Sequence, residues 1–403
     1  MNSLWRPRAL GIYFLSFATG VIGALLLPTL SIFFADEIDV SPFWVGIPYA
    51  GIALGSIFYN QLLGDWSDRL HDRRLLVLAL CVVGLIACAV FALSRDYWVT
   101  CLCAIGLLSL AMVSFSQVLA YSLEYAETVI ATERIALFNA LVRAQIAFAW
   151  VAGPPAGFLL VSHFGFTTLY ASAAVLFVVV ALLTLLLLPA LDEHHQKTKP
   201  ASISFLQLIR GPGGRNLWLC LLALSLMWGV NNAYLISLPL HLTRNLELDT
   251  GWVGWIMGTA AGLEVPVMLL SGVLAARVSA MFIVRASGLA GLILYAGIYW
   301  ADALWQLFAL QLANAVFIGI LAGLGVSVVQ QMLPGRAGSA SALYTNTTHV
   351  GTLISSALVS SVAEAFGYHS VFAANMVLVL LATLLFFYVR VEKTGAGGER
   401  ASD

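Results

Sequence analysis

Residues 75–93 read LLVLALCVVGLIACAVFAL, an apolar stretch without a single charged residue. A helix needs about 20 consecutive apolar residues to cross the hydrocarbon core of a bilayer, which is roughly 30 Å thick. This stretch, bounded by Arg74 and Arg95, therefore predicts a membrane-spanning helix.

The composition extends this prediction to most of the chain. Of 403 residues, 61% are hydrophobic and 10% are charged, whereas an ordinary soluble domain has about 25% charged residues. The net charge of −1 gives no indication of nucleic-acid binding. The five cysteines lie in apolar stretches without metal-ligand spacing, so we expect them to be small hydrophobes and expect no metal or cofactor.

Eleven further apolar stretches have the length of a membrane span. Helix is the expected structure for all of them, because every backbone polar group in hydrocarbon must be satisfied within its own segment. The chain is thus predicted to be an all-α integral membrane protein with twelve spans, at 9–35, 44–63, 75–93, 97–121, 135–160, 166–190, 216–243, 251–272, 281–301, 304–333, 339–363 and 368–390.

Basic residues are distributed very unevenly between the two sides of the membrane. Of the 19 Lys and Arg residues, only Arg95 and Arg244 fall on one side, Arg143 lies inside a span, and all others fall on the side of the N-terminus. Because cytoplasmic loops collect Lys and Arg, both termini are predicted to be cytoplasmic.

The longest polar interruption, 191–215, predicts a cytoplasmic linker between two domains of six helices, 1–190 and 216–403. These halves resemble each other at three places in the same order. Residues 15–24 match 224–233, Trp44-Val45-Gly46 matches Trp252-Val253-Gly254, and 136–138 match 342–344. Parallel repeats of this kind build one class of secondary transporters, in which the substrate site lies near the midplane between the halves.

The loop after the second span, residues 64–74, reads GDWSDRLHDRR. It resembles the G-x-x-x-D-R-x-G-R-R/K-R/K loop of the major facilitator superfamily, although His71 replaces the usual glycine and Asp72 a usual base. The resemblance implies that this loop acts as a conformational latch. The matching positions are Gly64, Asp68, Arg69, Arg73 and Arg74.

The fifth span ends in Gly153-Pro154-Pro155-Ala156-Gly157, which looks like the G-P-x-x-G stretch of antiporters in that superfamily. The chain is more closely similar to bacterial sugar efflux transporters, at VRAQ (142–145), GTAAGLEVP (258–266), LQLANAVFIG (310–319) and LPGRAG (333–338). This resemblance implies a transporter of the cytoplasmic (inner) membrane, not an enzyme, that exports sugars or glycosides at the expense of the proton gradient. We expect it to work as a monomer.

Polar side chains inside spans are costly in lipid and should face the bundle interior or a watery cavity. Amides and aromatic rings together suit a sugar, because amides bond hydroxyl groups and rings cover its apolar face. The predicted substrate-binding residues are Arg143, Trp150, Trp228, Asn231, Asn232, Tyr234, Gln311, Asn314, Asn346 and His349. Any single amide among them is equally well explained as a contact between helices.

Arg143 and Glu264 are charged residues in opposite halves, and the 1.5 Å rise per residue places Arg143 close to mid-depth and Glu264 somewhat beyond it. We predict that they couple sugar export to protons; a structural ion pair between the halves is the alternative. A proton-coupled multidrug exporter is the second functional candidate, which the amide-rich interior makes less favoured than a sugar exporter.

Overall fold

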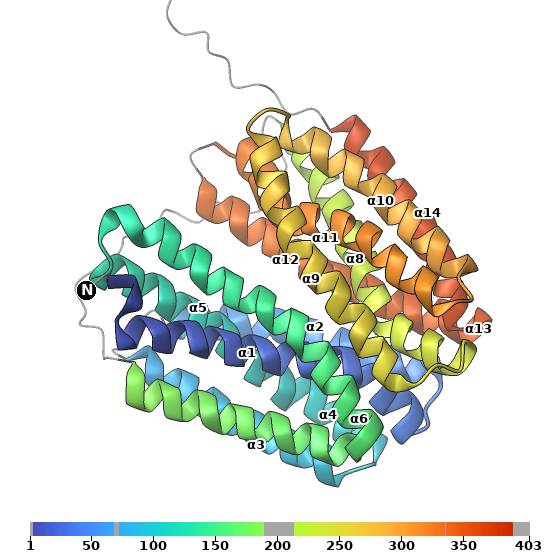
Figure 1. The fold of residues 1–403 in the computed structure, drawn as a ribbon, viewed down its shortest axis with the longest axis horizontal. Coiled ribbons are helices and arrows are strands. Elements are labelled where there is room, and N and C mark those ends of the chain that lie inside the picture. The colour runs from blue at the N-terminus through green and yellow to red at the C-terminus, as the bar shows by residue number, and fades with distance from the viewer. Residues whose placement is uncertain (1–2, 68–71, 189–212, 335, 390–403) are drawn as a thin grey trace, which may run out of the picture.

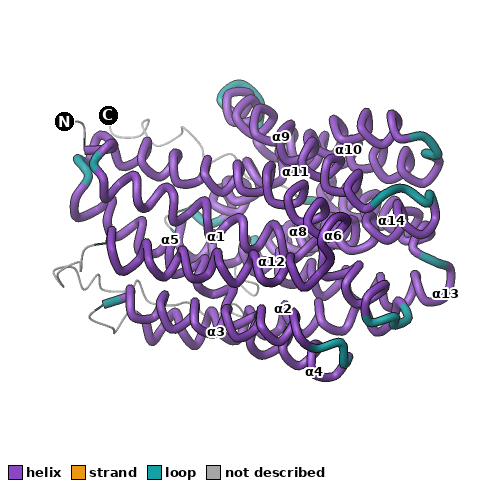
Figure 2. The backbone as a smooth tube through the Cα atoms, turned by 60° about the horizontal axis from the view of Figure 1, so that its bottom comes forward, coloured by secondary structure: helices purple, strands orange, loops and turns teal. Residues whose placement is uncertain are grey.

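The computed structural model describes residues 3–67, 72–188, 213–334 and 336–389, and within these ranges it contains helices and no strand (Figure 2). In the N-terminal half, the longer helices are α1 (Pro7–Ile32, continued by the π-helical turn η2, Phe33–Glu37), α2 (Pro42–Ser67), α3 (Arg73–Leu93), α4 (Tyr97–Cys103, continued by η3, Ala104–Leu108, and α5, Ser109–Val129) and α6 (Ile135–Leu187).

The C-terminal half repeats this order. Its elements are α8 (Gly214–Leu240), the π-helical turn η5 (His241–Asn245), α9 (Thr250–Ala275), α10 (Ala280–Trp300), α11 (Leu304–Met332), α12 (Ala337–Leu358), the π-helical turn η6 (Val359–Ala363), α13 (Glu364–Phe366) and α14 (Tyr368–Tyr388). The predicted stretch 75–93 lies within α3.

The twelve predicted spans are present. Eleven continuous helical stretches of the described chain are long and apolar enough to cross a bilayer. One of them, Thr132–Leu187, contains two spans, because Gly165 interrupts α6 with φ 77° and ψ 174°. That backbone conformation is essentially restricted to glycine. The fifth and sixth spans therefore meet at a single residue.

Short polar side chains begin several of these helices. Asp72, Asp96, Asp249 and Ser279 each accept a hydrogen bond from a backbone N–H in the first turn of α3, α4, α9 and α10. The first N–H groups of a helix have no partner within it, so such caps fix where the helix begins. The capping side chains thus define where these spans begin, which a hydropathy pattern alone does not show.

The spans form two six-helix bundles, which lie side by side in Figure 1. The bundles meet chiefly where α6 packs against α9, where α2 packs against α12 and η6, and where α1 approaches α8. Most of the predicted linker 191–215 and both ends of the chain lie outside the described residues.

Matching glycines occupy matching contacts in the two halves. A Cβ at Gly20 of α1 would lie 2.8 Å from Ala149 of α6, and a Cβ at Gly229 of α8 would lie 3.1 Å from Ile354 of α12. Gly20 and Gly229 are equivalent in the sequence repeat. Both permit two helices of one bundle to approach closely, which is a common role of small residues in membranes.

Candidate transport pathway between the two bundles

One end of the interface between the bundles is closed by an ion pair. Arg244 on η5 forms a salt bridge of 2.6 Å with Asp36 on η2, and its guanidinium also donates to the carbonyl oxygen of Ala35. Both charged side chains are more than one third exposed. We call the end of the molecule that carries this pair the closed end.

Two further hydrogen bonds close the same end between α2 and the neighbourhood of η6. The backbone N–H of Phe43 donates to Oε2 of Glu364 at 2.9 Å, and the hydroxyl of Ser360 donates to the carbonyl oxygen of Phe43 at 3.1 Å. The hydrogen bonds and the salt bridge that join described residues of opposite bundles all lie here. The sequence pointed to Arg244 only as one of two basic residues on its side of the membrane, and gave Asp36 and Glu364 no role.

The other large contact between the bundles has no such polar bonds among the described residues. A Cβ at Gly254 of α9 would lie 2.7 Å from Cα of Pro155, and a Cβ at Gly258 would lie 2.5 Å from Cγ of the same proline. On the other side of the Gly-Pro-Pro stretch, Gly153 and Gly157 pack against Ala24 and Leu25 of α1. The stretch is thus a packing element between three helices.

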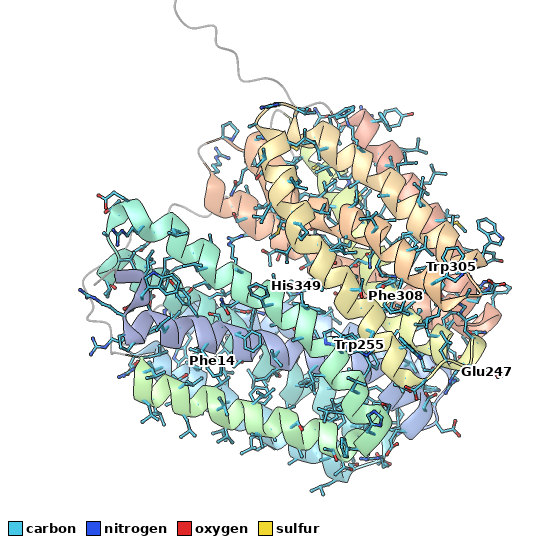
Figure 3. All side chains as sticks on the ribbon, in the orientation of Figure 1. Phe14, Glu247, Trp255, Trp305, Phe308 and His349 are labelled. Atoms are coloured by element: carbon cyan, nitrogen blue, oxygen red, sulfur yellow. The ribbon has the colours of Figure 1, made fainter. Side chains whose placement is uncertain are left out.

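The predicted site residues nearest the boundary are differently exposed. Arg143 on α6 and Asn346 on α12 are exposed, whereas Trp150 and His349 are half-buried. Figure 3 shows His349 along the boundary between the bundles. Glu264 on α9 is half-buried, and within the described chain no salt bridge joins it to Arg143. The structure therefore does not bring the predicted coupling pair together.

Three predicted site residues form a buried cluster inside the C-terminal bundle. Tyr234 of α8 donates to Oε1 of Gln311 at 2.9 Å, and Asn314 donates to the same oxygen at 3.1 Å. Each of the three residues is at most 2% exposed. Apart from Oδ1 of Asn314, their polar side-chain atoms bond one another or the carbonyl oxygen of Leu307. Glu264 lies close enough to act electrostatically on the Tyr234 hydroxyl.

The remaining predicted residues lie on α8 near α12. Asn232 donates to the hydroxyl of Thr352 at 3.0 Å, and Asn231 is half-buried. The Trp228 ring meets the ring of Tyr344 edge-on at 6.4 Å, and its Nε1 is buried. This face carries an indole ring and two amides.

The loop predicted to be a latch is only partly described. Asp68 and Arg69 lie outside the described residues, and a Cβ at Gly64 would meet nothing within 4 Å. Arg73 forms a salt bridge of 2.6 Å with Glu124, and Arg74 forms one of 2.6 Å with Asp72. The hydrogen bond from Arg74 lowers the pKa of the Asp72 carboxyl. Both pairs lie within the N-terminal bundle.

Known proteins fit this architecture. The family model of the Major Facilitator Superfamily matches residues 12–345 and 289–402. Sugar efflux transporter A of Dickeya chrysanthemi is 42% identical over 93% of this chain and 94% of its own length. Sugar efflux transporter B of Salmonella typhimurium is 38% identical over 94% of each chain, and Sugar efflux transporter C of Escherichia coli is 35% identical over 92% and 93%.

Solved structures agree on the fold. Nucleoside transporter NupG superposes with a TM-score of 0.81 at 14% identity, over 95% of this chain and 99% of its own. A bacterial homologue of the human lysosomal transporter Spinster gives a TM-score of 0.74 at 12% identity, over 96% and 97%. The chain belongs to the Major Facilitator Superfamily and, within it, to the sugar efflux transporters. It is a multi-pass transporter of a bacterial membrane, not an enzyme.

Proposed function

We propose that the protein exports sugars or glycosides by alternating access, driven by proton antiport. One observation carries the proposal. The bundles are bonded together at the closed end, whereas Arg143 and Asn346, from opposite bundles and near mid-depth, are exposed. Because a charged side chain deep in a membrane faces water or protein rather than lipid, this exposure supports a watery route that reaches the middle from one side.

The distribution of basic residues supports an orientation for this route. Both termini and the segment 191–215 are proposed to be cytoplasmic, in the inner membrane of the cell. The closed end, which carries Arg95 and Arg244, then faces outward. In this conformation a monomer takes up substrate from the cytoplasm.

Sugars are the proposed cargo because of the side chains along the route and because the relatives are named sugar efflux transporters. Trp150 and Trp228 supply aromatic faces for the apolar side of a sugar ring. Amides and an imidazole on α8 and α12 supply paired donors and acceptors for hydroxyl groups. These polar contacts are proposed for Asn231, Asn232, Asn346 and His349.

Transport by the pure protein in proteoliposomes tests this function. With a proton gradient that is acidic inside the vesicles, antiport should drive uphill uptake of a labelled lactose-like sugar. A protonophore should abolish this uptake. Lipophilic cations are the comparison cargo, since a multidrug exporter would prefer them. Uphill transport of the cations without any transport of sugars would overturn the proposal.

Glu264 is proposed to carry the coupling proton, and Arg143 to respond to its charge from the opposite bundle. Glu264→Gln imitates the protonated carboxyl with little change in shape. We expect it to abolish uphill sugar movement and to leave sugar exchange down its own gradient, because a ligand or proton drives a change only by binding one state better. Arg143→Ala is expected to impair both activities. Uphill transport at the normal rate by Glu264→Gln would exclude Glu264 as the coupling group.

A further inference from the structure

The buried cluster in the C-terminal bundle contains a polar atom without a hydrogen-bond partner among the described residues, Oδ1 of Asn314 on α11, which is a residue only 2% exposed. On the neighbouring helix α10, the hydroxyl of the fully buried Tyr295 is unpaired in the described chain as well. Native proteins keep few such atoms, because leaving a buried polar group unpaired is costly. The unpaired acceptor of Asn314 points to a donor that bonds there in a different protonation state.

Gln311 determines which atom of Asn314 is left unpaired. Its Oε1 accepts from both Tyr234 and Asn314, and its Nε2 donates to the carbonyl oxygen of Leu307 at 2.7 Å. These bonds fix the orientation of both amides. Asn314 is therefore held with its nitrogen toward Gln311 and its carbonyl oxygen available to a donor.

Glu264 is the carboxyl that helix packing brings to this cluster. α9 lies along α11, and the carbonyl oxygen of Glu264 is 3.1 Å from the Cβ position of Gly319. The Glu264 side chain acts electrostatically on Tyr234, as Tyr234 does on Tyr295.

Few other charges reach this carboxyl. The sequence of α11 contains no titratable residue. The only Arg or Lys of α6, the helix on the other side of α9, is the exposed Arg143. No salt bridge of the described chain involves Glu264, and the titratable group that acts on it from a neighbouring helix is the Tyr234 hydroxyl.

We propose that protonated Glu264 donates a hydrogen bond to Oδ1 of Asn314, and that Gln311 is a positioning residue that holds this acceptor in place. A neutral carboxyl has one O–H donor, whereas a carboxylate can only accept, so the carbonyl oxygen favours the protonated form. A rotation of the Glu264 side chain, or one bridging water that also bonds Tyr295, makes the contact. The inference rests on the proposed coupling role of Glu264.

The bond has a mechanical consequence, because it ties α9 to α11. α9 is also the helix that packs against the Gly-Pro-Pro stretch of the opposite bundle. Protonation of Glu264 therefore fixes α9 to its own bundle, and deprotonation releases it. Gln311 and Asn314 accordingly serve the proton rather than the sugar.

The pH dependence of uphill sugar efflux in proteoliposomes tests this assignment. Asn314→Leu removes the acceptor and keeps the branched outline of the side chain, so the protonated form of Glu264 loses one hydrogen bond. We expect the pH midpoint of uphill efflux to move down by about one pH unit, the usual worth of one hydrogen bond, while downhill exchange persists. Gln311→Leu should move it in the same direction by less.

Asn375→Leu is the matched control. Asn375 of α14 is also a buried amide whose Oδ1 has no partner in the described chain, and it donates to the carbonyl oxygen of Val230. We expect no shift of the midpoint for this variant. An unchanged midpoint in Asn314→Leu, or an equal shift in Asn375→Leu, would overturn the proposal.

Infrared difference spectroscopy of the purified protein gives a measurement that does not depend on transport. The C=O band of the protonated carboxyl, identified by its loss in Glu264→Gln, is expected to move to higher frequency in Asn314→Leu as its hydrogen bond is lost. A band that stays in place refutes the bond even if Glu264 couples transport. Normal uphill transport by Glu264→Gln would instead refute the proposed function.

Discussion

The two main contacts between the bundles occupy equivalent places in the sequence repeat but differ in chemistry. Where α9 meets α6, Gly254 and Gly258 pack against Pro155, and Gly258 also packs against the carbonyl oxygen of Val151. The contact is made by backbone and ring atoms. Where α2 meets η6, Gly46 lies under Ser360, but polar bonds from Phe43 to Ser360 and Glu364 surround it.

This difference separates two kinds of contact within one duplicated design. The α6–α9 contact is close-packed, so its strength depends on shape and is lost steeply when the helices separate. The polar contact at the closed end exchanges its bonds for bonds to water when it opens, so its net cost of opening is small. In the proposed alternating access, we infer that the first contact acts as the pivot and the second as the part that opens.

The largest expected effect comes from filling the proposed pivot. In Gly258→Leu, the new Cβ would lie 2.5 Å from Cγ of Pro155 and 2.9 Å from the carbonyl oxygen of Val151. Overpacking of this kind costs about 1–3 kcal/mol, and about 1.4 kcal/mol corresponds to a tenfold change. We expect sugar exchange in proteoliposomes to fall about tenfold.

Gly272→Leu on the same helix is the control, because nothing lies within 4 Å of a Cβ at Gly272. It should exchange sugar at the normal rate. If Gly258→Leu also exchanges normally, the α6–α9 contact is not a close-packed pivot.

An intermediate effect is expected at the ion pair of the closed end. Arg244→Ala removes a partly exposed salt bridge, which is worth about 0–1 kcal/mol, so the outward-open population should rise at most about fivefold. The rate at which an impermeant maleimide labels Asn231→Cys from the outer face measures this population. All five native cysteines are buried, so they contribute little background.

Exchanging the charges provides the test of specificity. Asp36→Arg combined with Arg244→Asp should restore the normal labelling rate, because the pair is re-formed in the opposite sense. Faster labelling that persists in this double variant would show that the ion pair does not close the end.

The smallest effect is expected at Asp72, whose partners lie within one bundle. Asp72→Ala removes the N-cap of α3 and should lower the free energy of unfolding by about 1 kcal/mol without changing the labelling of Asn231→Cys. The pKa of Asp72 is lowered in the folded protein by its hydrogen bond with Arg74. Its stabilisation is therefore fully present above the unfolded pKa of about 3.9 and is lost as the pH falls through the lower folded value.

Asp72→Asn separates cap from charge, since asparagine caps a helix about as well as aspartate. Thermal unfolding can be followed between about pH 3 and about pH 7, a range that includes the titration of an ordinary carboxyl group. The midpoint of unfolding should depend less on pH for this variant than for the native protein. A change in maleimide labelling in either Asp72 variant would mean that this loop contributes to closing the far end.

The spans themselves were predictable from the sequence because lipid imposes one simple rule on them. The exception is instructive: the fourth span, predicted as 97–121, continues as α5 to Val129. Glu124 and Glu127 end the apolar pattern, yet the helix projects beyond the hydrocarbon, where Glu124 pairs with Arg73. Hydropathy reports where lipid ends, not where the helix ends.

The site was less predictable, because its contacts join residues far apart in sequence. Gln311 and Asn314 are three residues apart and so share a helix face, and the structure joins them by a hydrogen bond. Their burial against Tyr234 was not predicted, since helical spacing does not say what a face packs against. The ion pair at the closed end was missed, although one signal existed: the repeat places Asp36 of the first span one residue from the position equivalent to Arg244 of the seventh.

Gly165 has a counterpart in the other half, Gly367, and these single-residue connections limit where the chain can be digested or tagged. Gly367, with φ 81° and ψ 164°, connects the last two spans as Gly165 connects the fifth and sixth. The longest connections on that face are 38–41 and 246–249. Proteases and inserted epitopes both need an exposed, yielding segment of backbone, and this face offers almost none. Limited digestion of whole cells should therefore leave the chain uncut, and a tag for surface detection belongs in 246–249 rather than at either glycine.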